Sequence, residues 1–98
     1  MRSLILGDGI LGSEMIQQTG WDCISRKKDN FNITDKSTYH ILTKVKFGVI
    51  QYCPYDIIIN TIACTDSYSN NKNLHYQTNY KGVSNLVEFC NKWNIKLV

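Results

Sequence analysis

Three glycines at the end of an apolar run constrain the fold of this chain most strongly. The apolar residues 3–6 stop at Gly7, and Gly9 and Gly12 complete the spacing GxGxxG. Apolar positions then recur at helical spacing as far as Gly20, which suits a helix C-cap. A buried strand, a glycine loop and a helix in this order are typical of a phosphate-binding βαβ unit, although GxGxxG alone is a weak signal.

The rest of the chain alternates strand and helix patterns. The first expected elements are a strand over 21–24, a loop over 25–30, and a helix after Thr34 or Asp35 whose apolar face runs on through Val45 and Val49, with the breakers Gly48 and Pro54 leaving the stretch between them open. A strand over 55–60, a helix through 83–93 with Val87 and Trp93 in the core, and a strand over 94–98 are expected after it. Buried-type strands linked by helices favour a parallel sheet with helices on both faces. We therefore predict a Rossmann-type three-layer α/β/α fold with four strands in the order 3-2-1-4.

Size and composition predict one small domain over residues 1–98. The net charge of +3 comes from scattered lysines, apart from the run 25–29, which argues against a nucleic-acid binder. The four cysteines form no CxxC pair, so we expect reduced thiols and no zinc framework. The N-terminus lacks a signal-peptide pattern, and no apolar segment is long enough to span a membrane, so the expected compartment is the cytoplasm.

Each glycine has an expected role in a dinucleotide site. Gly7 allows the tight turn out of the strand, Gly9 lets the backbone approach a pyrophosphate, and Gly12 lets the helix pack close to the sheet. The N–H groups near Ile10 and Leu11, at the start of the helix, would point at the anion. The alternative is a glycine-containing turn in a domain that binds no nucleotide.

The end of the second strand bears on the choice of cofactor. An NAD site usually has an acidic residue there to hold the ribose 2′-OH, whereas this chain has Ser25, Arg26 and Lys27. A guanidinium and an ammonium suit a 2′-phosphate, so the pattern favours NADP. A solvated basic loop is the alternative, and the nearby Asp29 leaves NAD open. Residues 61–65, after the strand 55–60, are expected to form the second wall of the crevice or an ordinary strand end.

The whole chain resembles a known enzyme family. The stretches "LILGDGILG", "FNITD", "YDIIINTIACTD", "NYKGVSNLVEFC" and "NIKLV" together resemble the extended short-chain dehydrogenases, the NAD-dependent epimerase/dehydratase group, and in particular its dTDP-4-dehydrorhamnose reductase branch. In that family these stretches mark the glycine loop, the adenine-side loop, strand four, the helix with a characteristic asparagine, and strand five. The resemblance implies a nicotinamide cofactor and a 4-keto nucleotide-sugar substrate.

Further site residues are implied by this resemblance. Gly9, Ile10 and Leu11 would touch the pyrophosphate, Arg26 would face the adenosine ribose, Asn32 and Ile33 would flank the adenine, Ala63, Cys64 and Thr65 would line the ribose and nicotinamide side, and Asn79 would take the place of the family asparagine. Three features depart from the family pattern. The loop is GxGxxG where many relatives have GxxGxxG, Asn32 stands where an Asp is common, and residues 44–53 form a longer connection.

The catalytic pair of the family is missing from a suitable place. Relatives carry a Tyr-x-x-x-Lys pair beyond strand five, whereas here only Tyr68 and Lys72 have this spacing, in a loop before the long helix. We therefore expect a cofactor-binding half that is inactive alone and meets a nucleotide-sugar only with a catalytic half. The alternative is a non-catalytic nucleotide-binding or interaction module that pairs through its exposed sheet edge, as a homodimer or with a separate catalytic part.

Overall fold

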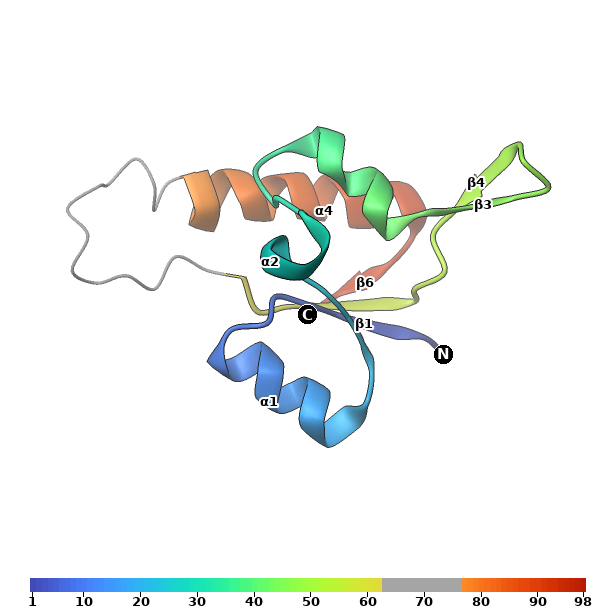
Figure 1. Cartoon of the computed structure of the whole chain (residues 1–98). Coiled ribbons are helices and arrows are strands. Elements are labelled where there is room, and N and C mark those ends of the chain that lie inside the picture. The colour runs from blue at the N-terminus through green and yellow to red at the C-terminus, as the bar shows by residue number, and fades with distance from the viewer. Residues whose placement is uncertain (63–76) are drawn as a thin grey trace.

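The computed structural model describes residues 1–62 and 77–98, which form an α/β domain around a parallel sheet. In chain order the elements are β1 (Ser3–Leu6), α1 (Ile10–Thr19), β2 (Asp22–Ile24), α2 (Arg26–Asp29), the 3-10 helix η1 (Lys36–Leu42), β3 (Lys44–Lys46), β4 (Ile50–Tyr52), β5 (Ile57–Asn60), the π-helical turn η2 (Gln77–Lys81), α4 (Gly82–Trp93) and β6 (Lys96–Leu97). Helix α1 covers one face of the sheet, and α4 with η1 covers the other (Figure 1). The predicted α/β fold with a four-strand parallel sheet and helices on both faces is confirmed.

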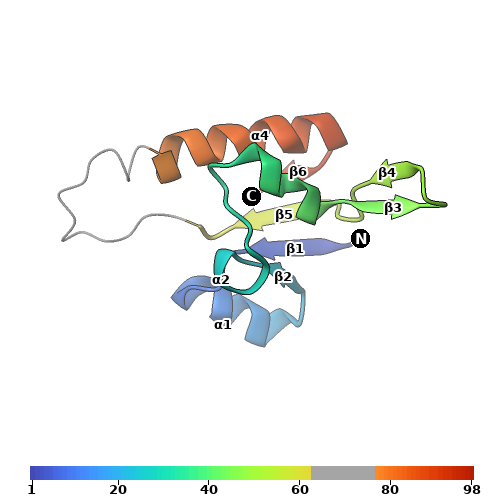
Figure 2. The same cartoon turned by 45° about the horizontal axis from the view of Figure 1, so that its top comes forward.

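The order of the strands differs from the prediction. The sheet runs β2-β1-β5-β6, so the third of its four strands, β5, lies beside β1 instead of beyond β2. Parallel pairing sets Ser3 against Ile57 and Leu6 against Asn60. The chain after β2 leaves the sheet through α2, η1 and the hairpin, so no described strand lies outside β2 (Figure 2). The predicted order 3-2-1-4 is therefore wrong for strands counted along this chain. The family resemblance instead numbers residues 55–60 as strand four. In the Rossmann order 3-2-1-4 strand four lies beside strand one, which is where β5 lies here.

The central strand is buried on both faces. Leu4, Ile5 and Leu6 are fully buried, and Ile58 of the neighbouring strand β5 is as well. Leu4, Leu6 and Ile58 belong to the main core under α4 and η1, whereas Ile5 stands outside that cluster because successive side chains of a strand point to opposite faces. Continuous apolar runs are what a parallel strand between two helical layers requires.

The helix caps follow from local residues. Gly20, at φ 69°, ends α1 and donates its N–H to the oxygen of Ile16. The Asp35 carboxylate accepts from the N–H of Ser37 and begins η1, one of the two predicted start points. The expected loop over 25–30 instead contains the helical turn α2, because the Ser25 hydroxyl accepts from Lys28 N. This short helix could not be predicted from the sequence, because Ser25 is followed by no apolar pattern of helical spacing.

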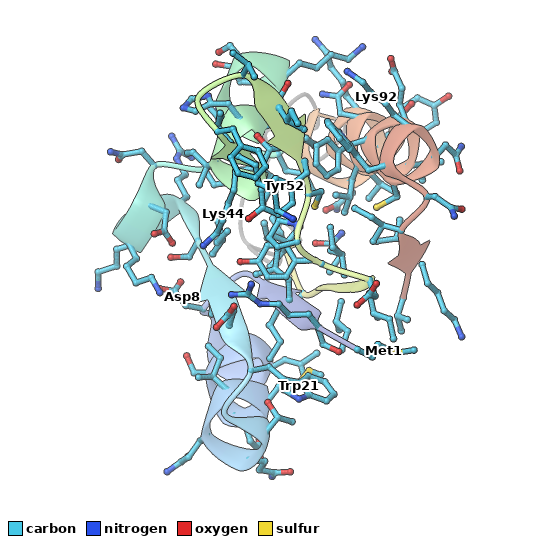
Figure 3. All side chains as sticks on the ribbon, turned by 90° about the vertical axis from the view of Figure 1, so that its right-hand side faces the viewer. Met1, Asp8, Trp21, Lys44, Tyr52 and Lys92 are labelled. Atoms are coloured by element: carbon cyan, nitrogen blue, oxygen red, sulfur yellow. The ribbon has the colours of Figure 1, made fainter. Side chains whose placement is uncertain are left out.

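The helix expected to continue through Val45 and Val49 ends at Leu42. Lys44–Lys46 and Ile50–Tyr52 pair instead as an antiparallel hairpin that projects from the sheet (Figure 1). Its cross-strand partners Lys44 and Tyr52 are labelled in Figure 3. Val45 and Val49 are 60% and 83% exposed, so their expected burial is wrong.

Of the two positions of α4 (Gly82–Trp93) that were expected in the core, only one is there. Trp93 packs against the core, whereas Val87 is 41% exposed and was wrongly expected inside. A chain of three ring contacts runs through the helical layer above the sheet, two of them linking η1 to its neighbours and the third lying within α4. Phe31 and Tyr39 have centroids 5.0 Å apart, Tyr39 and Phe89 5.5 Å, and Phe89 and Trp93 6.3 Å. These contacts fix η1 and the chain before it against α4.

Candidate functional site

The glycine loop joins β1 to α1 at the carboxyl edge of the sheet. Gly7 has φ 99°, and a Cβ there would lie 2.6 Å from Thr61 Oγ1. Gly12 is buried where α1 meets the sheet, and a Cβ on it would collide with the oxygen of Gly7 and lie 2.8 Å from Thr61 Oγ1. Both positions therefore require glycine for structural reasons, and both abut the start of the segment after β5.

Gly9 differs from the other two glycines. It is the N-cap of α1 at φ −67°, and a Cβ there would meet nothing within 4 Å. No side chain among the described residues caps the first turn of α1, and that turn contains no acidic residue. Its free N–H groups and the helix dipole leave a place where an anion can approach the backbone. Ile10 and Leu11 are 93% and 62% exposed there.

Ser25 closes the end of β2 and is only 1% exposed. Its Oγ donates to Asp8 Oδ2 at 3.1 Å and accepts from Lys28 N at 3.1 Å. Its own N–H donates to Asp29 Oδ2 at 3.0 Å. The predicted site residue Ser25 is therefore a joint between the glycine loop and α2, and the Asp29 carboxylate is engaged in holding α2.

The basic run contributes one side chain to the site. Arg26, the first residue of α2, borders the pocket described below. Lys28 Nζ donates to the main-chain oxygen of Cys23 at 2.9 Å, which ties it to β2. Lys27 is exposed and does not border that pocket. The Cys23 thiol donates to the oxygen of Gly7 at 3.5 Å, and burial raises its pKa, so it acts as a neutral packing group.

The segment 31–33 lies across the pocket from the glycine loop, and several hydrogen bonds and buried side chains hold it in place. Phe31 is fully buried and Ile33 is 4% exposed. Asn32 Oδ1 accepts from both the N–H and the hydroxyl of Thr34, at 3.1 and 2.8 Å, which makes a local turn. The oxygen of Ile33 accepts from Tyr39 Oη at 2.8 Å and from Asn85 Nδ2 at 3.3 Å.

These parts enclose a pocket of about 240 Å³ at the carboxyl ends of β1, β2 and β5. Its lining residues are Gly7, Asp8, Gly9, Ser25, Arg26, Phe31, Asn32, Ile33, Thr61 and Ile62. Six of the predicted site residues meet here, namely Gly7, Gly9, Ser25, Arg26, Asn32 and Ile33, and residues 61 and 62 belong to the predicted second wall. Ile10, Leu11, Gly12 and Lys27 lie outside the lining. Ala63, Cys64 and Thr65 fall outside the described residues.

Sequence reasoning missed three residues around this pocket. Asp8 lies between two glycines, and only the glycines were considered there. Phe31 follows a polar run and had no periodic partner to mark it as buried. Asn85, at 8% exposed, reads as a polar position of α4, yet it reaches the loop beside the pocket.

Outside this pocket, the described residues form one further cavity of note, which also has charged residues, Lys36, Glu88 and Lys92, in its lining. This second cavity of about 270 Å³ lies between η1 and α4, with Tyr39, Phe89 and Trp93 among its lining residues, and it lies apart from the glycine loop. Within residues 1–62 and 77–98, no three His, Cys, Asp or Glu side chains are grouped to hold a metal ion. In the same part of the chain, no helix is long and apolar enough to cross a membrane.

Comparison with known proteins shows a likeness of fold. No protein-family model matches the sequence, and no curated protein matches it. The crystal structure of a dTDP-4-dehydrorhamnose reductase from Clostridium acetobutylicum is similar, with a TM-score of 0.68 and 21% sequence identity. The match covers 99% of this chain and 34% of that one, so this chain spans about a third of that reductase's length. The two proteins therefore share a Rossmann-like α/β fold.

Proposed function

We propose that residues 1–98 are the nicotinamide-dinucleotide-binding domain of a nucleotide-sugar reductase or epimerase of the short-chain dehydrogenase type. The observation that carries the proposal is one pocket that joins the glycine loop, Arg26 and the segment 31–33. Open α/β sheets bind their ligands at this carboxyl edge. The likeness of fold to a dTDP-4-dehydrorhamnose reductase and the family resemblance of the sequence support a nucleotide-sugar as the substrate of the whole enzyme.

The residues present fit a dinucleotide. The open space beside Gly9 leaves room for a pyrophosphate against the backbone, and the first turn of α1 offers N–H donors to it. Arg26 would pair with a 2′-phosphate, which favours NADP over NAD. Asn32 and Ile33 border the pocket on the side where the family resemblance would put the adenine. Ala63, Cys64 and Thr65 remain the proposed lining of the nicotinamide side.

When bound, the reduced nicotinamide would supply a hydride to the keto group of the sugar. This chain would bind and orient the cofactor, and it would not donate the proton that the reduction also needs, because no Tyr-x-x-x-Lys pair stands in a suitable place. We therefore propose that the 98-residue chain binds nucleotide without turning over a sugar. Measurable NADPH-dependent reduction of a 4-keto nucleotide-sugar by the pure chain would contradict this.

Gly9→Ala tests the phosphate site cleanly. The added Cβ meets nothing in the folded chain at an allowed φ, so the loss should be limited to that of a poorer N-cap, about 0.5–1 kcal/mol or roughly 2–8 °C in the thermal midpoint. In the complex the same Cβ would stand between backbone and pyrophosphate, so affinity for NADH and NADPH should drop roughly tenfold or more. The matched control is Gln17→Ala, on the exposed side of the same helix. Unchanged affinity in Gly9→Ala would overturn the proposed phosphate site.

A second candidate, association through the sheet edge, is favoured by one observation. Among the described strands, β6 has β5 as its only neighbour, so one side of β6 is open to another strand. The partner would be a second copy or a separate catalytic part. Sedimentation velocity of the pure chain over a range of concentrations tests the homodimer, and a monomer throughout would exclude it.

A further inference from the structure

The carboxylate of Asp8 borders the pocket beside the end of β2. Asp8 follows Gly7 in the glycine loop, and its Oδ2 accepts the Ser25 hydroxyl at 3.1 Å. This hydrogen bond holds the carboxylate at the end of β2, beside Ser25, the residue that precedes Arg26. In Figure 3 Asp8 lies on the same side of the molecule as α2. A carboxylate from the β1 loop therefore reaches the place where NAD sites usually have an acidic residue at the end of β2.

Asp8 and Arg26 are the charged residues that the described part of the chain brings to this pocket. Among the ten described lining residues, Asp8 is the only acid and Arg26 the only base. Asp29, the acid nearest to Arg26 in the sequence, accepts the N–H of Ser25 at 3.0 Å and is not part of the lining. Asp29 therefore serves the cap of α2, and the acidic character of the pocket comes from Asp8.

We propose that Asp8 is a specificity-determining residue that opposes Arg26 in the choice between NAD and NADP. A carboxylate accepts hydrogen bonds from ribose hydroxyls and repels a phosphate at the same place, whereas a guanidinium attracts that phosphate. The pair makes the site admit both cofactors, with the ratio of affinities set by the balance of the two charges. This inference rests on the proposed function, since it concerns the nucleotide that the pocket binds.

The test is the ratio of the two dissociation constants in single and double variants. Asp8→Asn keeps an oxygen that can accept from Ser25 Oγ but removes the charge, so the loop should stay in place. We expect this variant to bind NADPH more tightly relative to NADH by roughly tenfold. Arg26→Gln should move the ratio in the opposite direction by a similar factor, and the double variant should lie between them.

A carboxylate at the start of β2, away from the pocket, provides the control. Asp22 lies at the start of β2 and pairs with Arg2 at 3.0 Å, so Asp22→Asn makes the same change in net charge away from the pocket. Its affinity ratio should equal that of the unmodified chain. Adenosine 2′,5′-bisphosphate and AMP serve as probes of the adenosine half alone, and their ratio should shift as the ratio of the full cofactors does.

The outcomes separate this inference from the function on which it rests. If the unmodified chain binds neither cofactor, both proposals are wrong. If it binds and Asp8→Asn leaves the NADPH-to-NADH ratio unchanged, or weakens both equally, Asp8 shapes the loop without choosing the nucleotide, and only the inference is overturned. Circular dichroism and the thermal midpoint of each variant show whether the fold is kept.

Discussion

The hydroxyl of Tyr39 donates a 2.8 Å hydrogen bond to the main-chain oxygen of Ile33. Tyr39 is 6% exposed, and its ring packs between Phe31 and Phe89 in tilted and edge-on contacts that hold it in place. The same oxygen of Ile33 accepts from Asn85 of α4. Two elements that lie behind the pocket wall thus fix the backbone of a segment that lines it.

Tyr39→Phe should loosen this wall. It keeps the ring contacts and removes one buried hydrogen bond, so the free energy of unfolding should fall by about 1 kcal/mol. Nucleotide affinity should weaken by a few-fold, because the segment 31–33 is then less ordered before binding. Urea unfolding and calorimetric titration measure the two effects.

The control for that change is Tyr52→Phe in the hairpin, where Lys46 Nζ lies over the ring at 4.8 Å and the ring is kept. This variant should alter neither quantity. If it weakened nucleotide binding as much as Tyr39→Phe, the hydrogen bond to Ile33 would not be the cause.

Alkaline pH should destabilise the fold through Cys90. Burial raises the pKa of its thiol from 9.0 to about 11, with a smaller contribution from Cys53. In the unfolded chain the thiol ionises at its ordinary value, so above about pH 9 the unfolded state holds fewer protons than the folded state. The stabilisation is complete below that pH and is lost as pH rises toward 11. Urea unfolding across this range should show the decline.

Cys90→Ala identifies the group responsible for that pH dependence. This variant starts from a lower stability, since it leaves a small cavity, but its stability should decline less steeply with pH. Burial also raises the pKa of Tyr39, so a residual decline at higher pH is expected. An unchanged slope in Cys90→Ala would assign the effect to other groups.

Gly12, within α1, and Gly20, which caps its C-terminus, should respond differently to the same substitution. Gly12→Ala places a Cβ against the Gly7 oxygen and Thr61 Oγ1, and relieving this clash would require the helix and the sheet to move apart. We therefore expect the free energy of unfolding to fall by about 2–4 kcal/mol. Gly20→Ala has open space and only a positive φ of 69° to oppose it, so the loss should be about 1 kcal/mol. Thermal or urea unfolding of both variants tests the close approach of α1 to the sheet, which equal losses would contradict.

The hairpin turn contains a residue that is poorly suited to its conformation. Phe47 has φ 55°, Gly48 has φ 72°, and Val49 N donates to the oxygen of Lys46 at 3.1 Å. Successive positive φ values are the mark of a type I′ turn, for which Asn-Gly is preferred. Phe47 is also 88% exposed. Phe47→Asn should therefore stabilise the chain by about 0.5–1 kcal/mol.

Val49→Asn is the matched comparison for that variant. It removes another exposed apolar side chain, 83% exposed, from the same turn but not from a position with positive φ. Its stability should stay within about 0.5 kcal/mol of the unmodified chain. An equal gain from both variants would mean that lost apolar exposure, and not backbone conformation, is what stabilises.

The sequence predicted the parts of this fold that local chemistry determines. The apolar run before Gly7, the C-cap at Gly20 and the cap at Asp35 are short-range signals, and all three are where they were expected. The strand order depends on pairing between distant segments, Ser3 with Ile57 among them, which no local pattern encodes. The hairpin was missed because Phe-Gly is an uncommon sequence for its turn.

The candidate site divides in the same way. Glycine spacing and the end of a predicted strand led to Gly7, Gly9 and Arg26, which line the pocket. Each of these signals can be recognised from a few neighbouring residues of the sequence. Asp8 and Asn85 act across the structure, through Ser25 and Ile33, and only the folded arrangement brings those groups together.

The glycine loop of this chain is proposed to hold a dinucleotide. Calorimetric titration of the purified chain with NADPH and NADH, and with nicotinamide mononucleotide as a probe without adenine, tests it most directly. We expect saturable binding of the dinucleotides, one per chain, and much weaker binding of the mononucleotide, because the pocket joins the loop to the adenine-side segment 31–33. A folded sample that binds neither dinucleotide would contradict it.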